Sequence, residues 1–295
     1  MDISFGFKTP PVHTTYAEIL RVWEEADDIP ELAHGWLWDH FLPLFGDPHG
    51  PILEGWTLLS ALAARTRRLD LGIMVTGNAA RLPAVLGKIA TTVDVISGGR
   101  LVFGVGVGAT ALDRPRQELA VREYEAYGLP LVRPDDGIRR LAETCDIVRR
   151  MWTEAAFDHD GESFRLVDCV NEPKPVRQPP LLVGAWGRRA LRVVAEYADI
   201  WNVPGPPHNS VDYLAGRARV LDQHCAALGR DPSTIVRSAQ VVVDYREPAT
   251  TAGFVGQLAQ HGFTHIVLNL GAPYPPNVAR WLVDEVVSSA VAQAA

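Results

Sequence analysis

Eight short apolar runs, separated by longer amphipathic segments, are the feature that most constrains the fold of this chain. Short apolar runs alternating with helical periodicity are the pattern of β-strands connected by helices on a parallel sheet. The expected strands are 3–7, 35–41, 69–76, 101–108, 180–186, 200–205, 238–245 and 265–271. The expected helices are 14–27, 52–65, 83–96, 137–153, 188–198, 210–228, 250–261 and 277–292.

Eight such repeats favour an α/β fold of the (β/α)₈ TIM-barrel type over two doubly wound halves. No Pro-, Gly- or Ser-rich linker divides the chain, so we expect residues 1–295 to form a single barrel domain. A net charge of −7 without a basic stripe argues against nucleic acid as a partner. Three widely spaced cysteines, no signal-peptide pattern and no long apolar stretch predict a soluble cytoplasmic protein without membrane contact.

Two stretches are longer than the repeat requires, residues 109–136 and 155–179. Long insertions after barrel strands are commonly binding loops, so we expect both at the C-terminal face, flanking the pocket mouth. Within the second, "FDHDGESFRL" predicts a hairpin that turns at Asp160 and Gly161. The alternative is that both are surface loops without a function.

An Asp-His pair, Asp39 and His40, interrupts the apolar run "GWLWDHFLPL". Burial of an ionisable group costs several kcal/mol unless it is paired, so the two either satisfy each other or face a site. Active sites of barrels lie at the C-terminal ends of the strands, where this pair falls, together with Thr76 and Asn78. A histidine there can exchange protons near neutral pH, but a structural His-Asp pair remains an alternative.

Two glycine-containing stretches are further candidates. The segment "VFGVGVGA" (102–109) is a weak dinucleotide motif, and its glycines indicate close approach of a flat ligand or another backbone, or small residues needed for packing inside the barrel. The stretch "LLVGAWGRRALRVVAEYAD" (181–199) predicts a strand ending at Gly184 and a helix that begins with Arg188 and Arg189. Free amides and two cations at a helix N-terminus indicate a phosphate site.

Long blocks of the sequence resemble the bacterial luciferase-like monooxygenase superfamily. The resemblance rests on "WLWDHF" (36–41), "LEGWTLLSALAARTRRLDLGIMVTGN" (53–78), "RLPAVLGKIATTVDVISGGRLVFGVGVG" (81–108) and "AEYADIWN" (195–202). The "DHF", "VTGN" and "SGGR" segments are most similar to the branch that uses the deazaflavin coenzyme F420. The resemblance implies a (β/α)₈ barrel, commonly a homodimer, that uses F420 or reduced FMN.

The resemblance also implies roles for individual residues. Asp39 would lie near the deazaflavin head and His40 would be the proton donor. A strained peptide at Ile73 and Met74 would back the ring, and residues 184–189 would contact phosphate. The implied cofactor-binding residues are Asp39, Ile73, Met74, Thr76, Asn78, Val107, Gly108, Gly184, Ala185, Trp186, Gly187 and Arg188.

One position departs from the pattern. Sugar-phosphate dehydrogenases of this branch carry a glutamate after the last strand glycine, where this chain has Ala109. Glucose 6-phosphate is therefore not expected as the substrate. We expect hydride transfer between reduced F420 and a small organic molecule, with an FMN-dependent monooxygenase as the alternative. An inactive cofactor-binding barrel and a metal-dependent hydrolase are less favoured, because Asp39, His40 and the phosphate site occur together and the histidines show no metal-ligand spacing.

Overall fold

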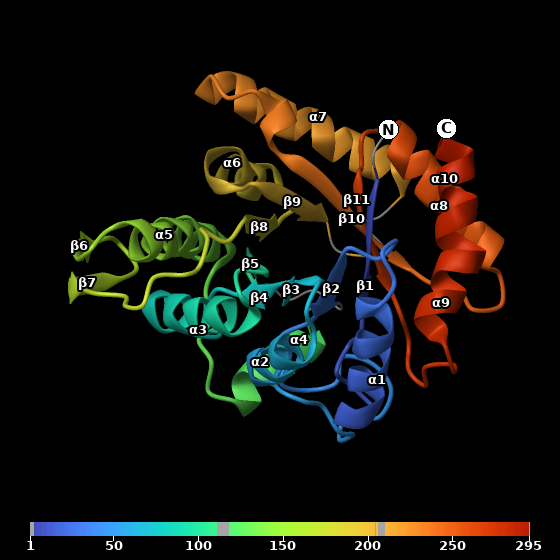
Figure 1. The fold of residues 1–295 in the computed structure, drawn as a ribbon. Coiled ribbons are helices and arrows are strands. Elements are labelled where there is room, and N and C mark those ends of the chain that lie inside the picture. The colour runs from blue at the N-terminus through green and yellow to red at the C-terminus, as the bar shows by residue number, and fades with distance from the viewer. Residues whose placement is uncertain (1–2, 111–117, 204, 206–209, 295) are drawn as a thin grey trace.

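Eight parallel strands form a closed barrel in the computed structural model, which describes residues 3–110, 118–203, 205 and 210–294 (Figure 1). The barrel strands are β1 (Ser4–Lys8), β2 (His34–Leu37), β3 (Asp70–Ile73), β5 (Leu101–Gly106), β8 (Leu181–Gly184), β9 (Ile200–Val203), β10 (Val236–Val242) and β11 (His265–Asn269). Their order is β3-β2-β1-β11-β10-β9-β8-β5, and pairing of β3 with β5 closes the ring. The (β/α)₈ prediction and all eight expected strands are confirmed.

Most strands end earlier than their apolar runs. Strand β2 ends at Leu37, so Asp39 and His40 lie in the loop that follows it. The run 69–76 is split into β3 and the two-residue β4 (Thr76–Gly77), which pairs with β5. The functional candidates are therefore placed on short connections just beyond the strands.

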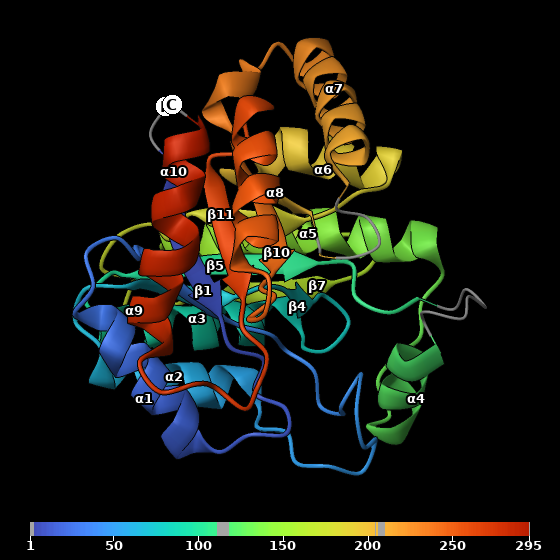
Figure 2. The ribbon, with the colours of Figure 1, turned by 90° about the vertical axis from the view of Figure 1, so that its right-hand side faces the viewer.

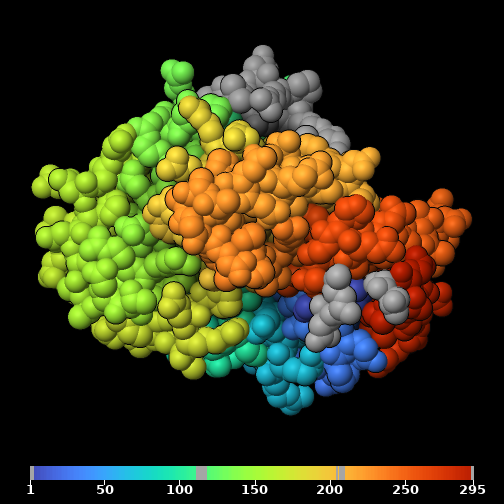
Figure 3. Space-filling model, turned by 90° about the horizontal axis from the view of Figure 1, so that it is seen from above, coloured from blue at the N-terminus to red at the C-terminus, as the bar shows by residue number. Residues whose placement is uncertain are grey.

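Helices follow the strands in the order expected for a barrel and cover its outside. They are α1 (Tyr16–Asp27), α2 (Gly55–Arg65), α3 (Pro83–Ser97), α5 (Pro134–Thr153), α6 (Arg188–Tyr197), α7 (Val211–Leu228) and α8 (Pro248–Gln260). The C-terminal segment 277–292 is divided into α9 (Val278–Leu282), a π-helical turn η2 (Val283–Val287) and α10 (Ser288–Ala294). A short 3₁₀ turn, η1 (Pro232–Thr234), precedes β10. Figure 3 shows one face covered by the middle and last parts of the chain.

Side chains alternate between the two sides of the barrel wall, as the twofold period of strands requires. On β1, Phe7 points outward and packs edge-on against Trp23 of α1, with ring centroids 5.4 Å apart. A separate buried cluster is formed by Trp36, Met74, Val102, Leu182, Ile200 and Val267. Five of them are inward positions of their strands and Met74 directly follows β3, so they fill the barrel lumen beneath the site. Among the described residues, none of the helices is both long and apolar enough to cross a lipid bilayer.

The first insertion, 109–136, follows β5 and contains helix α4 (Glu118–Ala126), which Figure 2 shows set apart from the ring of helices. Its residues 111–117 lie outside the described residues. The placement after a strand matches the expected position at the C-terminal face.

The second insertion, 155–179, does not lie at that face. Its hairpin is confirmed: β6 (Phe157–Asp160) pairs antiparallel with β7 (Arg165–Cys169) and lies outside α5 (Figure 1). The turn begins at Gly161, whose amide donates to the Phe164 carbonyl at 3.0 Å.

After the hairpin, the second insertion runs along the N-terminal ends of the strands. The amine of Lys174 donates to the carbonyl of Met151 near the end of α5 at 3.0 Å. Arg177 pairs with Asp70, the first residue of β3, at 3.1 Å. The expectation that this insertion flanks the pocket mouth is therefore wrong, because it follows a helix that has returned the chain to the opposite end of the barrel.

Candidate active site

Asp39 is fully engaged by an arginine that is distant in sequence. Its two carboxylate oxygens accept from the Nη1 and Nη2 atoms of Arg81, at 2.5 and 3.0 Å. The carboxylate is 0% exposed and the arginine side chain 14%. Burial raises the pKa of Asp39, while the Arg81 guanidinium and the Thr76 hydroxyl oppose this by stabilising the ionised form. Asp39 and His40 therefore do not satisfy each other.

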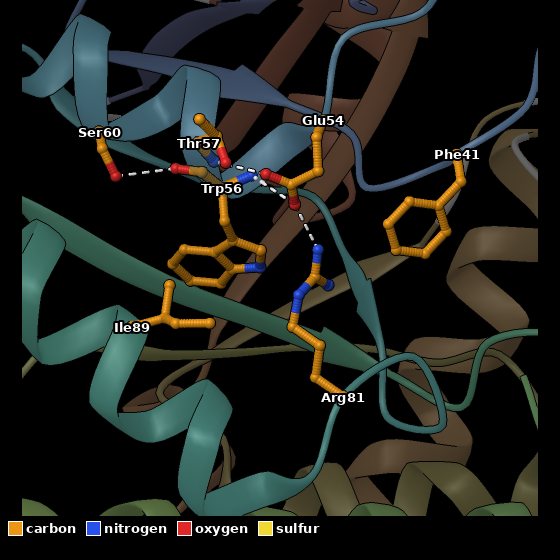
Figure 4. A pocket seen from close by; sticks show the side chains of 7 residues that line it. All are labelled: Phe41, Glu54, Trp56, Thr57, Ser60, Arg81 and Ile89. Atoms are coloured by element: carbon orange, nitrogen blue, oxygen red, sulfur yellow. Dashed lines mark hydrogen bonds and ion pairs between the residues drawn. The ribbon is translucent and has the colours of Figure 1, made fainter. Parts of the chain in front are cut away.

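Arg81 also joins the start of α2 to this cluster. It donates to the carboxylate of Glu54, which in turn caps α2 by accepting from the amides of Trp56 and Thr57 at 3.2 and 2.7 Å. Figure 4 shows the Arg81 guanidinium directed at Glu54, on the wall of a pocket that Trp56 and Phe41 also line. The guanidinium lies 5.3 Å from the centroid of the Phe41 ring. One cation thus connects the loop after β2, helix α2 and the segment before α3.

His40 is held by a glutamate of α4. The Nδ1 atom of His40 lies 2.9 Å from Oε2 of Glu123, whose side chain is 1% exposed while that of His40 is 30% exposed. The other oxygen of Glu123 accepts from the backbone amides of Phe41 and Leu42. A buried carboxylate therefore fixes both the ring and the loop that carries it.

Helix α4 also closes over the ends of β4 and β5. The hydroxyl of Tyr124 accepts from the amide of Ala109 at 3.3 Å, and burial raises the pKa of Tyr124 to about 12. A Cβ at Gly77 or Gly108 would lie 2.6 or 2.4 Å from this hydroxyl, closer than real Cβ contacts. Gly108 also has a positive φ of 77°, which favours glycine. The first insertion is thus fastened to three strand ends.

The glycines of "VFGVGVGA" make room for another part of the backbone. A Cβ at Gly104 would lie 2.0 Å from the carbonyl oxygen of Ile73, and one at Gly106 or Gly184 would lie about 3 Å from Val75. Of the readings open from sequence, close approach of a backbone is therefore confirmed. The peptide bond between Met74 and Val75 is cis, one residue after the position that the resemblance implies.

Thr76, Asn78 and Val107 lie beside this segment. The Thr76 hydroxyl accepts from the indole N–H of Trp56 at 2.8 Å. The amide nitrogen of Asn78 donates to the carbonyl of Gly137 in the first turn of α5 at 2.8 Å. A Cβ at Gly137 would lie 2.7 Å from Val107, so this side chain packs against the same turn. Thr76 and Asn78 therefore have structural partners.

The segment 184–189 forms a strand-to-helix turn at the same end of the barrel. Ala185 donates its amide to the carbonyl of Asn202 on β9 at 3.1 Å, Trp186 is 40% exposed, and Gly187 is the N-cap residue of α6 without a side-chain cap. Arg188 is exposed and lies 3.5 Å from the Gln223 side chain.

Arg189 pairs with Asp135 of α5. A cation at a helix N-terminus opposes the helix dipole, and at Arg189 this unfavourable interaction is relieved by a carboxylate of the protein itself. Arg188 has no carboxylate partner among the described residues.

Several buried polar atoms at these strand ends have no hydrogen-bond partner among the described residues. They include the indole nitrogen of Trp38 after β2, the side-chain oxygen of Asn78 after β4, and the side-chain oxygen of Asn269 at the end of β11. Unpaired buried polar atoms are uncommon in folded proteins. Donors and acceptors at the C-terminal ends of the strands fit a flat ring with polar edges, such as a flavin or a deazaflavin.

Arg81 and Glu123 were missed by the sequence reasoning. Arg81 precedes the Leu-Pro pair that starts a helix, and a lone cation between two apolar blocks was an available signal. No comparable signal in the sequence marked Glu123, because it is one of several acidic residues in a charged segment that resembles an ordinary solvated helix face.

Comparison with known proteins places this geometry in a family. The family described as luciferase-like monooxygenase matches this chain over residues 4–252. The chain belongs to this family. The structure of an F420-dependent secondary alcohol dehydrogenase in complex with an F420-acetone adduct shares its fold, with a TM-score of 0.84 and 15% sequence identity over 98% of this chain and 99% of that chain. The structure of a long-chain alkane monooxygenase also shares the fold, with a TM-score of 0.76 and 13% identity over 99% of this chain and 92% of that chain.

Curated relatives within the family are about 30% identical. A phthiodiolone/phenolphthiodiolone dimycocerosates ketoreductase of Mycobacterium sp. (strain JLS) is 30% identical over 65% of this chain and 48% of its own length. The pyrimidine monooxygenase RutA of Stutzerimonas stutzeri (strain A1501) is 31% identical over 68% of this chain and 53% of its own. An F420-dependent glucose-6-phosphate dehydrogenase of Amycolatopsis mediterranei (strain U-32) is 31% identical over 55% of this chain and 45% of its own length. The chain spans about half the length of the curated relatives it matches.

Proposed function

We propose that this protein is an oxidoreductase that transfers hydride between reduced coenzyme F420 and a small organic substrate. The observation that carries the proposal is His40, partly exposed at the C-terminal end of β2 and held 2.9 Å from the buried carboxylate of Glu123. A carboxylate that accepts from Nδ1 leaves Nε2 to exchange a proton with the substrate. We propose His40 as the proton donor and Glu123 as the residue that positions it.

The cofactor would be held by residues at the C-terminal ends of the strands. The peptide at Ile73 and Met74, which covers the glycines, would back the ring, and the amides of Gly187 and Arg188 at the start of α6 would face the phosphate. When bound, F420 supplies the hydride. We propose that Asp39 acts through Arg81, because both of its oxygens are already bound there.

The second candidate is a monooxygenase that uses reduced FMN and molecular oxygen. It is supported by the similarity to RutA, which covers 68% of this chain. Both cofactors present a flat tricyclic ring and a phosphate, so the geometry described above serves either.

Binding measurements with each cofactor distinguish the candidates. Fluorescence quenching by F420 at concentrations where FMN has no effect supports the proposal, whereas quenching by FMN alone overturns it. With cofactor and a reactive substrate, His40→Ala should bind the cofactor normally but turn over about 10²–10⁴-fold more slowly. Glu123→Gln tests the positioning role and should reduce kcat while leaving cofactor affinity unchanged. The control is His261→Ala, which removes an exposed histidine at the end of α8.

We also propose that the protein is a cytoplasmic homodimer. Three free cysteines support a reducing compartment. Leu82 and Val85, at the N-terminal end of α3, are 64% and 52% exposed, and apolar side chains exposed together are typical of an interface. Val85→Asp should convert a dimer to a monomer in light scattering, and an unchanged mass would reject this face.

A further inference from the structure

Lys8 is a buried cation that the proposed chemistry does not use. It is the last residue of β1, and since Phe5 and Phe7 face the outer helices, Lys8 lies on the inward face of the strand. It is 7% exposed, and its amine donates to the side-chain oxygen of Gln240 on β10. No carboxylate among the described residues pairs with it. Lysine is almost never buried without a partner charge, so its position needs an explanation.

A chain of hydrogen bonds fixes the acceptor that faces Lys8. The amide nitrogen of Gln240 donates to Asn202 at 2.7 Å, and Asn202 donates to the hydroxyl of Ser238 at 2.8 Å. That hydroxyl lies 2.8 Å from Nδ1 of His265 at the opposite end of the lumen. The bond to Asn202 orients the Gln240 amide so that its oxygen faces Lys8. Gln240 therefore accepts a hydrogen bond from one of the three ammonium N–H groups of Lys8.

No negative charge of the described residues acts on Lys8. Trp36 is its neighbour on β2 and Asn269 its neighbour on β11. Two histidines of the lumen, His34 and His265, begin β2 and β11 at the far end, and burial lowers the pKa of both. Burial alone lowers the pKa of Lys8 to about 7, so an anion that arrives beside it would favour the charged amine.

We propose that Lys8, at the C-terminal end of the barrel lumen, is an anion-binding residue for the substrate and that the substrate carries a carboxylate. This rests on the proposed function and names its substrate class. The two N–H groups not used by Gln240 donate to the carboxylate oxygens at the C-terminal end of the lumen. A single buried cation beside the amide side chain of Gln240 matches one negative charge better than the two of a phosphate.

Lysine-selective ¹³C,¹⁵N labelling of the full-length protein tests the proposal without any turnover. The sequence has only three lysines, so Lys88→Met and Lys174→Met assign two signals and leave Lys8 identified even if Lys8→Met does not fold. The expected result is a Lys8 titration midpoint near 7 that rises by at least about one unit in saturating acetate, a tenfold preference of acetate for the protonated amine. Sodium chloride at equal ionic strength is the control.

Two results would overturn the proposal. One is a Lys8 signal that responds no more to acetate than to chloride. The other is a Lys8 titration midpoint that F420 or FMN alone raises fully, so that added acetate has no further effect. Lys8 would then bind an anionic group of the cofactor and not of the substrate. Cofactor binding is measured separately by quenching, so a protein that binds acetate at Lys8 but neither cofactor refutes the proposed function alone.

Discussion

Replacement of Arg81 by methionine tests whether the cluster at Asp39 is held by its ion pair. The variant keeps the length of the side chain but removes both bonds to Asp39, at 2.5 and 3.0 Å. Because the Asp39 carboxylate is fully buried, it cannot be compensated by water. Breaking a buried pair by removal of one partner costs about 3–5 kcal/mol, and we expect a loss of this size in the free energy of unfolding at neutral pH. The bond to the partly exposed Glu54 adds little.

The pH dependence of this loss has a definite sign. Burial already raises the pKa of Asp39, and without Arg81 it should rise further. A carboxyl group whose pKa is higher in the folded state favours folding at low pH and opposes it as the pH rises through that folded value. The deficit of Arg81→Met should therefore be largest at neutral pH and shrink as the medium is acidified.

Urea unfolding followed by tryptophan fluorescence measures the effect, and Asp39→Asn completes a double-mutant cycle. The double variant should be more stable than the sum of the two single losses predicts, with a coupling of about 2–3 kcal/mol. The coupling should be nearly the same at low and high salt, because the pair is buried. A loss below about 1 kcal/mol in Arg81→Met, or additive losses, would show that Asp39 does not depend on Arg81.

Three further results are expected. Burial lowers the pKa of His265 to about 4, whereas in an unfolded chain it is about 6.5, so the free energy of unfolding should fall by about 3 kcal/mol as the pH drops from 6.5 to 4. His265→Gln should lose less stability over this pH range, and an equal loss in urea unfolding of the two proteins would contradict the prediction. Gly104→Ala should destabilise by more than about 2 kcal/mol, because its Cβ would lie 2.0 Å from a backbone carbonyl. Gly216→Ala in α7, whose Cβ would meet only the end of the Arg219 side chain at 3.8 Å, should be neutral or stabilising in the same denaturation assay. Arg188→Ala should weaken cofactor binding about ten- to a hundredfold in quenching titrations, while Arg192→Ala on the same helix should not, and equal affinities would remove Arg188 from the phosphate site.

The order of strands and helices could be read from the chain because it follows from local periodicity. Apolar side chains repeat every two residues or every three to four, and these periods follow from backbone geometry alone. Eight alternations of this kind leave few architectures other than a barrel. Close approach of another backbone was one of the interpretations open for the glycines at 104 and 106, but the sequence did not show that the approaching segment is Ile73–Val75, about thirty residues away.

The position of the second insertion follows from the order of the elements and not from periodicity. An apolar pattern shows that residues 155–179 exceed the repeat, but the face they occupy depends on whether a strand or a helix comes before them. Helix α5 reaches Thr153, so the insertion starts at the N-terminal end of the barrel. Reading the order of elements strictly would have placed it there.

By itself the sequence determined the barrel, the family and the strand ends at which Asp39, His40 and Arg188 lie. Only the tertiary structure decided the partners: Asp39 with Arg81, His40 with Glu123, and Lys8 with Gln240. These pairs join residues 42, 83 and 232 positions apart. Charged and polar side chains follow no period of their own, and which of them meet depends on how the strands and loops are brought together when the barrel closes.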